Sequence, residues 1–445
     1  MTEPIQYTTR ASSAASLVVE VEAAVASGRL APGQRLPSVR RLATDGGLSP
    51  ATVQAGLAEL RRRGVVVSES RRGSRIGERP PLARAGGLSV ARLPDGVCDL
   101  STGNPDPALL PDVSSVLGGL ATAATLYGEA PELPELAEPA RAAMRADGVP
   151  AAELCVVSGA LDGIERALAA WLRPGDRVAV ESPGYAPLFD LLRAQGLALE
   201  PVAIDERGMQ PAGLSGALER GARAVVVTPR GQNPTGAAFD AERAVALRGL
   251  LAEHPEVLLL EDDHLGAVAG SALHTLAGAG ARWAAARSVS KALGPDLRLA
   301  VLAGDEATVA RVRGRQLCGP GWVSHVLQRI VAALWADEAV SALVASAERR
   351  YAKRRLRLLT ALDERGLSAE GRSGLNVWMP VPDEAATAAA LLGRGWAVAG
   401  GARYKLHGRA GAIRITTASL RGSDTQRLAA DLAAVLAPVT ATRKG

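Results

Sequence analysis

Short apolar runs that alternate with amphipathic helical stretches constrain this chain more than any other feature, and they begin at about residue 97. The runs lie at residues 155–158, 177–181, 224–228, 257–261 and 299–303. Strands that are buried on both faces carry such continuous apolar runs, and the helices between them cover both faces of the sheet. The pattern therefore predicts an α/β fold with a mostly parallel central sheet.

A smaller unit is expected from about residue 340 to the end. A long Arg-rich helix begins there, and two candidate strands follow it at 374–381 and 412–419. Because helices and strands in separate blocks are typical of α+β structure, we expect a small C-terminal α+β subdomain at roughly residues 340–445.

The first 76 residues follow a different pattern. Three helices are predicted, at residues 12–26, 36–43 and 50–63. The third has Ser49 as its N-cap and Pro50 at its first position, and Gly64 ends it. An apolar run at 65–67, a polar turn and a second short strand ending at Ile76 predict a small hairpin.

A chain of 445 residues is longer than one typical domain, so two or three domains are expected. Residues 77–96 contain clustered Pro and Gly without periodicity and are predicted to be a linker. The linker separates an N-terminal domain, residues 1–76, from the α/β domain, residues 97–445.

All the excess positive charge lies in the first segment of the chain. Residues 1–80 hold 12 Arg, no Lys and 7 acidic residues, so their net charge of +5 equals that of the whole chain. The other 39 basic and 39 acidic residues cancel. A segment that binds nucleic acid needs such charge for the phosphates, although a solvated basic surface accounts for the charge equally well.

The three cysteines, Cys98, Cys155 and Cys318, have no metal-ligand spacing, and we expect reduced, buried thiols in a cytoplasm and no metal site. The apolar runs are too short to span a bilayer. Residues 1–10 lack a basic segment followed by an apolar one, so no secretion signal is expected. A cytoplasmic, nucleoid-associated protein is the resulting prediction.

Segment 28–76 closely resembles the winged helix-turn-helix of the GntR regulators, through its LPS turn, its Ser49–Pro50 helix start and its Arg72–Gly73 wing. In such a fold the helix 50–63 is the recognition helix, whose N-terminal residues face base edges in the major groove of double-stranded operator DNA. The same fold can also serve protein contacts.

The resemblance also assigns roles to single residues of this segment. Many relatives have Arg early in the recognition helix, where this chain has Pro50 and Gln54. Arg40 would contact a phosphate or a base, and the wing arginines would reach the DNA backbone or minor groove. The expected DNA-binding residues are Arg40, Ser49, Thr52, Gln54, Arg71, Arg72 and Arg75.

Segment 288–298, SVSKALGPDLR, combines an amine, two hydroxyls and a guanidinium. Pyridoxal 5'-phosphate needs an amine to form an imine, and its phosphate needs hydroxyls and a cation. Lys291 offers the amine of an internal aldimine, Ser288 and Ser290 offer the hydroxyls, and Arg298 offers the cation. The arrangement resembles the cofactor-lysine segment of fold-type-I aminotransferases.

Segment 258–264, LLLEDDH, is an apolar strand that ends in acids. A carboxylate at this edge can pair with the pyridine nitrogen of the cofactor, and the resemblance gives this role to Asp262. For Asp263, a helix cap or a surface position is plausible. The family usually has Tyr where His264 stands; imidazole can also donate a hydrogen bond to the phenolic oxygen of the ring.

Three further segments resemble cofactor-binding parts of the same family. TPRGQNPTG (228–236) offers Asn233 as a donor to the ring oxygen, and ESPGYAPLF (181–189) offers Tyr185 for stacking, although core packing also accounts for Tyr185. The strand, turn and helix of 156–168 present backbone N–H groups to a phosphate. The positions in this turn are Ser158, Gly159, Ala160 and Leu161.

Arg414, in AIRITTAS (412–419), resembles the arginine that binds the α-carboxylate of an amino acid, for which a guanidinium fork is suited. A structural ion pair is the alternative. Tyr127 resembles a position that reaches the cofactor phosphate of a neighbouring subunit, with Glu132 in place of a family glycine. DLSTGNPD (99–106) resembles the segment that lines the substrate side.

The order of the parts resembles the MocR/GabR-type subfamily of GntR transcriptional regulators. The resemblance implies a homodimer whose DNA affinity is controlled by pyridoxal phosphate and an amino-containing effector, which forms an external aldimine with its carboxylate on Arg414. Two alternatives stay open: a working aminotransferase with an accessory DNA-binding domain, and a sensor of pyridoxal phosphate alone.

Overall fold

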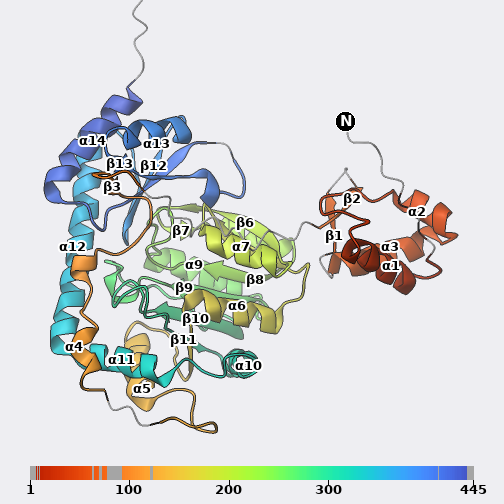
Figure 1. Cartoon of the computed structure of the whole chain (residues 1–445), viewed down its shortest axis with the longest axis horizontal. Helices are drawn as coiled ribbons and strands as arrows, with labels where there is room; N and C mark the ends of the chain where they lie inside the picture. The colour runs from red at the N-terminus through yellow and green to blue at the C-terminus, as the bar shows by residue number, and fades with distance from the viewer. Residues whose placement is uncertain are drawn as a thin grey trace, which may run out of the picture. The chain divides into compact units, whose positions relative to one another are not determined.

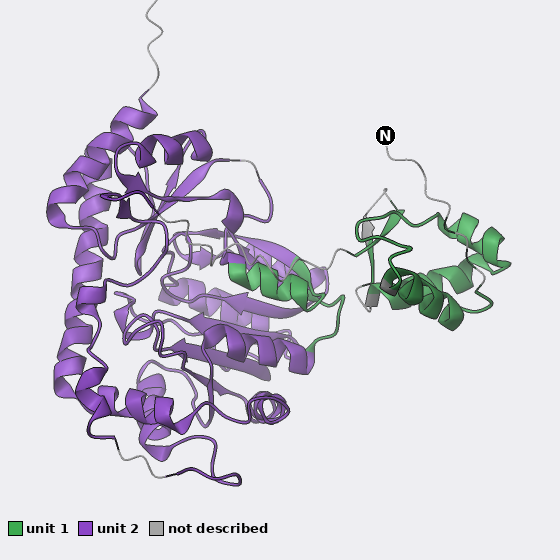
Figure 2. Cartoon of the chain, viewed as in Figure 1, with its two compact units in different colours: residues 1–89, 172–178, 187–199 green, residues 90–171, 179–186, 200–445 purple. Residues whose placement is uncertain are grey.

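The computed structural model describes residues 7, 9, 11–62, 65–69, 73–77, 93–120, 124–408 and 410–437. The chain divides into two compact units, shown in Figure 2. The first comprises residues 1–89, 172–178 and 187–199, and the second comprises residues 90–171, 179–186 and 200–445.

Three helices and a hairpin form the N-terminal part (Figure 1). They are α1 (Ala14–Ala26), α2 (Val39–Gly46), α3 (Pro50–Arg62), β1 (Val66–Glu69) and β2 (Gly73–Ile76). Leu17, Leu42 and Leu57, one from each helix, pack with Val66 and Ile76 of the hairpin into one core. The hairpin strands pair in antiparallel fashion, as the sequence predicts.

Helix α2 begins three residues later than the sequence predicts, so the range 36–43 was wrong. The N–H group of Leu36 donates to the carbonyl of Ser74 at 2.8 Å, which ties the preceding segment to the hairpin. Ser38 is extended, and its hydroxyl accepts the N–H group of Arg41, so the helix can begin only after this cap. Gly47, in the left-handed conformation, ends it.

Eight strands form a sheet in the order β4-β11-β10-β9-β8-β5-β6-β7. Their bounds are β4 (Glu153–Val157), β5 (Arg177–Ser182), β6 (Ala198–Asp205), β7 (Gly208–Met209), β8 (Ala222–Val227), β9 (Leu258–Asp263), β10 (Arg282–Ser288) and β11 (Ala300–Gly304). Strands β8, β9 and β10 pair in parallel, while β11 is antiparallel to both β10 and β4. The predicted α/β fold with a mostly parallel sheet is confirmed.

Helices of the α/β part lie before, between and after these strands in the sequence. They are α4 (Ser114–Leu117), α5 (Pro134–Ala146), α6 (Ala160–Trp171), α7 (Ala186–Ala194), α8 (Pro211–Glu219), α9 (Ala241–Ala252), α10 (Glu306–Leu317) and α11 (His325–Ala336). The long helix α12 (Glu338–Asp363) runs along one side of the second unit (Figure 1). This is the Arg-rich helix that the sequence predicts.

The C-terminal part has its own sheet and core. Strands β12 (Asn376–Pro380), β15 (Ala412–Thr416) and β14 (Ala399–Gly400) form a sheet in that order, and β3 (Cys98–Asp99) pairs with β13 (Trp396–Ala397). The remaining helices are α13 (Glu384–Leu392) and α14 (Gly422–Leu436). Leu100, from a segment far away in the sequence, is fully buried in this core with Leu358 and Ile415.

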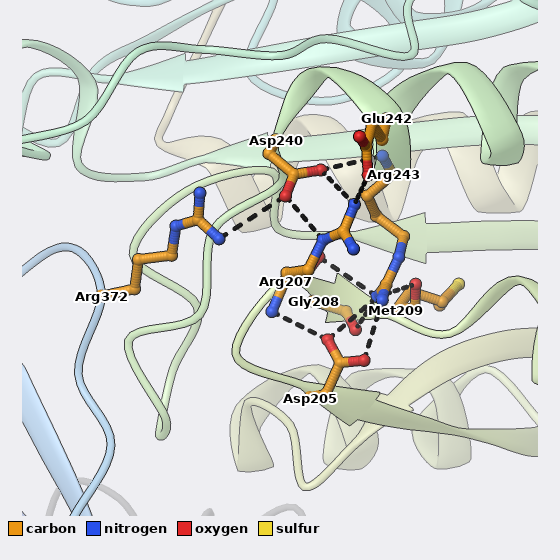
Figure 3. A network of polar contacts seen from close by, with 8 residues as sticks. All are labelled: Asp205, Arg207, Gly208, Met209, Asp240, Glu242, Arg243 and Arg372. Atoms are coloured by element: carbon orange, nitrogen blue, oxygen red, sulfur yellow. Dashed lines mark hydrogen bonds and ion pairs between the residues drawn. The ribbon is translucent and has the colours of Figure 1, made fainter.

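A polar network joins the turn between β6 and β7 to the start of α9 (Figure 3). The buried guanidinium of Arg243 donates to both carboxylate oxygens of Asp205, at 3.0 and 2.8 Å. It also donates to the carbonyl groups of residues 207–209, at 2.9 to 3.3 Å. Arg207 pairs with Asp240 at 2.6 Å, and hydrogen bonding from Arg207 lowers the pKa of Asp240 to about 2.

The prediction of three buried thiols was wrong for one of them. Cys155 is buried and Cys98 is half-buried, but Cys318 is exposed because it stands at the C-terminal end of α10. Within the described part of the chain, no single helix has the length and hydropathy that crossing a membrane requires; α11 and α12 meet that test only as a pair bent by 79°.

Candidate functional site

The predicted cofactor residues lie where parallel strands end. Strands β8, β9 and β10 run in one direction, and β4 runs the same way because β11 is antiparallel to both of its neighbours. Their carboxyl ends therefore share one edge of the sheet. Open α/β sheets bind ligands at this edge.

Lys291 follows β10 at this edge. Its Nζ donates to the carbonyl oxygen of Gly103 at 2.7 Å. Burial, and then the positive charges of Arg414 and Arg298, lower the pKa of Lys291 to about 8. The amine is therefore neutral, and so nucleophilic, in a much larger share of molecules at neutral pH than that of an exposed lysine.

The turn from Ser158 to Leu161 joins β4 to α6. Gly159 has φ = +102°, and a Cβ atom placed there would lie 2.6 Å from Nη2 of Arg298. The backbone and the Arg298 guanidinium thus approach each other closely at the N-terminus of α6, which favours anions. The hydroxyl of buried Ser288 donates to that of buried Ser290 at 3.1 Å. This donor set fits a phosphate group.

Strand β9 ends in three buried acids with different surroundings. Glu261 accepts hydrogen bonds from the hydroxyl of Thr275 and the N–H group of Leu276. For Asp262, no group among the described residues hydrogen-bonds to Oδ1, although the atom is buried. Burial, with the charge of Asp263 as a second cause, raises the pKa of Asp262 to about 7. A buried carboxylate oxygen without a partner fits a protonated ring nitrogen.

Asp263 is neither a helix cap nor a surface acid, so those expectations were wrong. Its carboxylate accepts hydrogen bonds from Arg230, at 2.8 and 2.9 Å, and from Arg287, at 2.8 Å. Arg287 also pairs with Asp147 at 2.7 Å. The two guanidinium groups lower the pKa of Asp263 despite its burial, so it stays ionised beside Asp262.

His264 and Tyr185 lie at the same site. Burial, and then the charge of Lys291, lowers the pKa of His264 to about 4, so the imidazole is neutral at neutral pH. Burial raises the pKa of half-buried Tyr185, and the charges of Asp262 and Arg414 act on it as well. The peptide bonds before Pro183 and after Asn233 are cis.

Arg414, on β15, is buried next to these groups. Its Nη1 donates to Oδ1 of Asn233 at 3.1 Å, and its Nη2 donates to the carbonyl oxygen of Ser101. The guanidinium carbon lies 5.2 Å from the ring centre of Tyr404. Its hydrogen-bond partners among the described residues are an amide and a backbone carbonyl rather than an acid, which argues against the structural ion pair that the sequence left open.

Tyr127 is not part of this cluster. Its side chain is 93% exposed, and its ring meets that of Trp322 edge-on, with 5.6 Å between the ring centres. Its role at a neighbouring subunit's cofactor stays a prediction.

The N-terminal part presents several of the predicted DNA-binding residues on its surface. Arg40 on α2 and Gln54 on α3 are exposed. The hydroxyl of Ser49 accepts the N–H group of Thr52 at 3.1 Å, so Ser49 caps α3 as predicted. Arg75 is half-buried on β2, and Arg71 and Arg72 lie outside the described residues.

Sequence reasoning missed several polar groups of the site. Glu181 is the last residue but one of β5, and its carboxyl group accepts the N–H group of Thr228 at 3.3 Å. An acid directly after an apolar run was the signal, and the same signal had identified Asp262. No local pattern indicates the partners Arg230 and Arg287, or the carbonyl groups of Ser101 and Gly103.

Comparisons with known proteins agree with this division. Residues 14–76 match the model of the bacterial regulatory proteins of the gntR family, and residues 95–432 match aminotransferase class I and II. The vitamin B6 salvage pathway transcriptional repressor PtsJ of Salmonella typhimurium is 40% identical over 412 residues, which cover 92% of this chain and 95% of the repressor.

Two further proteins are similar over most of their length. The HTH-type transcriptional regulator TauR of Rhodobacter capsulatus is 30% identical over 80% of this chain and 82% of its own. The crystal structure of the multiple substrate aminotransferase of Thermococcus profundus shares the fold, with a TM-score of 0.70 at 20% identity, over 77% of this chain and 92% of that one.

A GntR-type DNA-binding part joined to a fold-type-I aminotransferase fold defines a class of transcription regulators that carry an enzyme-like domain. The chain belongs to this class as a MocR-type member of the GntR family, and it is a DNA-binding transcription regulator. Its larger part belongs to aminotransferase class I and II, a family that depends on pyridoxal phosphate.

Proposed function

We propose that pyridoxal phosphate binds at the Lys291 site and, with an amino-containing effector, controls the affinity of this regulator for operator DNA. The observation that carries the proposal is that an amine with a lowered pKa and a buried carboxylate oxygen, which has no partner among the described residues, lie at the same edge of the sheet. The role of the PtsJ repressor in the vitamin B6 salvage pathway supports the same ligand.

Each polar group of the site has a counterpart on this cofactor. When bound, pyridoxal phosphate supplies an aldehyde that reacts with primary amines. Asp262 would pair with the ring nitrogen, Asn233 and neutral His264 would donate to the ring oxygen, and Tyr185 would stack on the ring. The phosphate would lie among Ser158, Gly159, Ala160, Leu161, Ser288, Ser290 and Arg298, with Tyr127 contributed by the other subunit of a cytoplasmic homodimer.

An effector with both an amine and a carboxylate would use Lys291 and Arg414 together. Arg414 offers a planar fork of donors that matches a carboxylate. Such a ligand changes DNA binding only if its affinity differs between two arrangements of the protein. The DNA contacts would come from Arg40, Ser49, Thr52, Gln54, Arg71, Arg72 and Arg75.

The first experiment is a titration of the purified full-length protein against DNA from upstream of its own gene. Affinity is measured without cofactor, with pyridoxal phosphate, and with cofactor plus a panel of amino acids. A change with cofactor plus one amine supports the full proposal. If no condition alters DNA binding, the proposal is wrong.

Replacement of the cofactor lysine gives the decisive variant. Lys291→Ala removes the amine, so it should lose the response of DNA affinity to pyridoxal phosphate while it still binds DNA. Lys353→Ala, which removes an exposed lysine of α12, is the matched control and should respond like the wild type. An unchanged response in Lys291→Ala contradicts the role of the amine.

The complete set of Lys291, Asp262, Asn233 and Arg414 also favours a second candidate function, an aminotransferase with an accessory DNA-binding domain. Steady formation of keto acids from the amino-acid panel would support it. A third candidate is a sensor of pyridoxal phosphate alone. It is favoured because Arg414, the proposed partner of an effector carboxylate, already donates to the Ser101 carbonyl. A change of DNA affinity with cofactor alone would support that candidate.

A further inference from the structure

Residues 101–104 (Ser-Thr-Gly-Asn), here called the strap, bind both cationic groups that the proposed ligand would use. Lys291 donates to the carbonyl oxygen of Gly103 at 2.7 Å. Arg414 donates to the carbonyl oxygen of Ser101. Both interactions are charge-assisted hydrogen bonds in a buried setting, which are stronger than those between neutral groups.

The chain before the strap is fixed to the C-terminal part. Leu100 is fully buried there; its N–H group donates to the carbonyl of Ala397 at 2.8 Å, and its carbonyl accepts the N–H group of Thr416 at 2.8 Å. The carboxylate of Asp99 then accepts the N–H group of Ser101 at 2.8 Å and its hydroxyl at 2.7 Å. Asp99 thus holds the first strap residue in the position that reaches Arg414.

The chain after the strap is fixed to α12. The N–H group of Asp106 donates to the hydroxyl of Tyr351 at 3.1 Å, and its carboxylate pairs with Arg354 at 2.8 Å. Within the strap, Gly103 has φ = +72°, a conformation that favours glycine. A Cβ atom at this position would make ordinary contacts, at 3.5 Å, with the guanidinium of Arg414. The strap is therefore a defined structure on the two cations.

We propose that the strap is an internal competitor for the ligand of the Lys291 site. The identity of that ligand rests on the proposed function. A ligand aldehyde must take the amine of Lys291 from Gly103, and a ligand carboxylate must take Arg414 from Ser101. The affinity measured for a ligand is then lower than its intrinsic affinity, by the fraction of molecules in which the strap is released. The strap sets the ligand concentration to which the regulator responds.

Its place in the chain gives the strap a second consequence. The strap follows β3, and β3 follows the predicted linker 77–96 that leads from the DNA-binding part. Only residues 97–100 separate the strap from the linker, and Leu100 fixes this short segment to the C-terminal part. A ligand that binds only after strap release favours one of two arrangements, which is the condition for control at a distance.

The first test loosens the strap without touching either cation. Asp99→Ala removes the acceptor that holds Ser101, whereas Asp99→Asn removes the same charge but keeps an oxygen acceptor. In absorbance titrations of the full-length protein, Asp99→Ala should bind pyridoxal phosphate about three- to tenfold more tightly than Asp99→Asn, which corresponds to about one hydrogen bond. Equal affinity, or weaker binding by a folded Asp99→Ala protein, overturns the proposal.

The second test needs no variant. Hydrogen–deuterium exchange is measured in the full-length protein with and without pyridoxal phosphate, at the amides of Ser101 and Asn104, which are bonded to Asp99 and Thr102. Faster exchange on addition of pyridoxal phosphate supports release of the strap. Unchanged or slower exchange at both amides overturns it.

DNA affinity measured on the same samples separates the two proposals. If pyridoxal phosphate changes DNA affinity while exchange in the strap is unchanged, the competitor is contradicted and the proposed function stands. If exchange becomes faster while DNA affinity changes neither with pyridoxal phosphate nor with pyridoxal phosphate plus the amino-acid panel, the competitor is supported and the proposed function is contradicted.

Discussion

Burial acts in the same direction on three ionisable side chains of the site, because it favours the neutral form of each. It lowers the pKa of Lys291 to about 8, and it raises the pKa of Asp262 to about 7 and that of Glu181 to about 8. For Asp262, the protonated ring nitrogen of bound pyridoxal phosphate would lower the pKa again. Glu181, in contrast, accepts a hydrogen bond from the N–H group of Thr228 within the protein. Its raised pKa is therefore a property of the folded chain and does not depend on a ligand.

The raised pKa of Glu181 makes the stability of the protein depend on pH. The unfolded chain ionises Glu181 at its ordinary pKa, while the folded protein keeps it protonated up to about pH 8. Between these values the unfolded state binds fewer protons, so stability falls as the pH rises. In Glu181→Gln this contribution is absent, and the free energy of unfolding should fall less between about pH 5 and pH 8. Urea unfolding at both pH values measures it.

Exposed Glu253, at the end of α9, provides the control for this measurement. Glu253→Gln should keep the pH dependence of the wild type. The same pH dependence in Glu181→Gln as in the wild type would show that Glu181 is not the group responsible.

Gly159→Ala tests the close approach of backbone and Arg298. The new methyl group would lie 2.6 Å from Nη2 of Arg298, so the guanidinium must move away from the proposed phosphate-binding turn. We expect at least tenfold weaker binding of pyridoxal phosphate, measured by absorbance. In Gly221→Ala, the matched control, φ is also positive at +85° but nothing lies within 4 Å, so only backbone strain of about 1–2 kcal/mol is added. Equal cofactor affinity in both variants would contradict the role of Gly159.

At this scale, the sequence predicted residue types better than partners. The acids after β9 were recognisable because they follow an apolar run. The role of Asp263 was not recognisable from the sequence, because its partners Arg230 and Arg287 are 33 and 24 residues away along the chain. A pairing between distant residues depends on strand order, which no local pattern contains.

Between elements, buried polar contacts hold turns and helix ends in place, and Arg243 is the clearest example (Figure 3). Arg243→Met would leave the carboxylate of Asp205 and the carbonyl groups of residues 207–209 without this donor. Because Asp205 is partly exposed, we expect a loss of about 2–4 kcal/mol in the free energy of unfolding, rather less than for a fully buried pair. Urea unfolding followed by circular dichroism measures it.

Arg193→Met is the control for Arg243→Met. Arg193 pairs with Asp190 at 3.3 Å, and both side chains are nearly half exposed. Such pairs contribute about 0–1 kcal/mol. Similar losses in the two variants would show that the network does not stabilise the fold.

Element prediction succeeded where the local signal was strong. Each of the five apolar runs overlaps an observed strand. Strand β10 was missed because its sequence, RWAAARS, has no run of β-branched residues, although neighbours on both sides bury most of it. The helix predicted at 36–43 was wrong for two reasons. Leu36 pairs with the hairpin instead of joining the helix, and Ser38 caps α2, a signal that the sequence prediction did not use.

Across the whole molecule, charge and ligand chemistry are separated along the chain. The net charge of +5 lies within the first 80 residues, and the residues of the proposed ligand site lie entirely beyond them. DNA binding should therefore depend strongly on salt, because each phosphate contact releases a counterion. The N-terminal part supplies that dependence.

Arg40→Gln tests one such contact. If Arg40 binds a phosphate, the slope of log affinity for DNA against log salt concentration should decrease in magnitude by about 1. Arg394→Gln, which removes a partner of Asp431 in the C-terminal part, should leave the slope unchanged. Weaker binding by Arg40→Gln at an unchanged slope would instead assign Arg40 to a base.

In the proposed function, the lowered pKa of Lys291 would also determine how quickly the regulator responds to its ligand. At pH 7, a lysine with an ordinary pKa is neutral in about 1 molecule in 3,000, whereas a pKa of about 8 makes this about 1 in 10. The weaker basicity of the amine offsets only part of this gain. Capture of an aldehyde at a given concentration is then faster by a large factor, and the response time of the switch shortens accordingly. The burial of Lys291, with the positive charges of Arg414 and Arg298 as further causes, would thus set the speed of the proposed sensing.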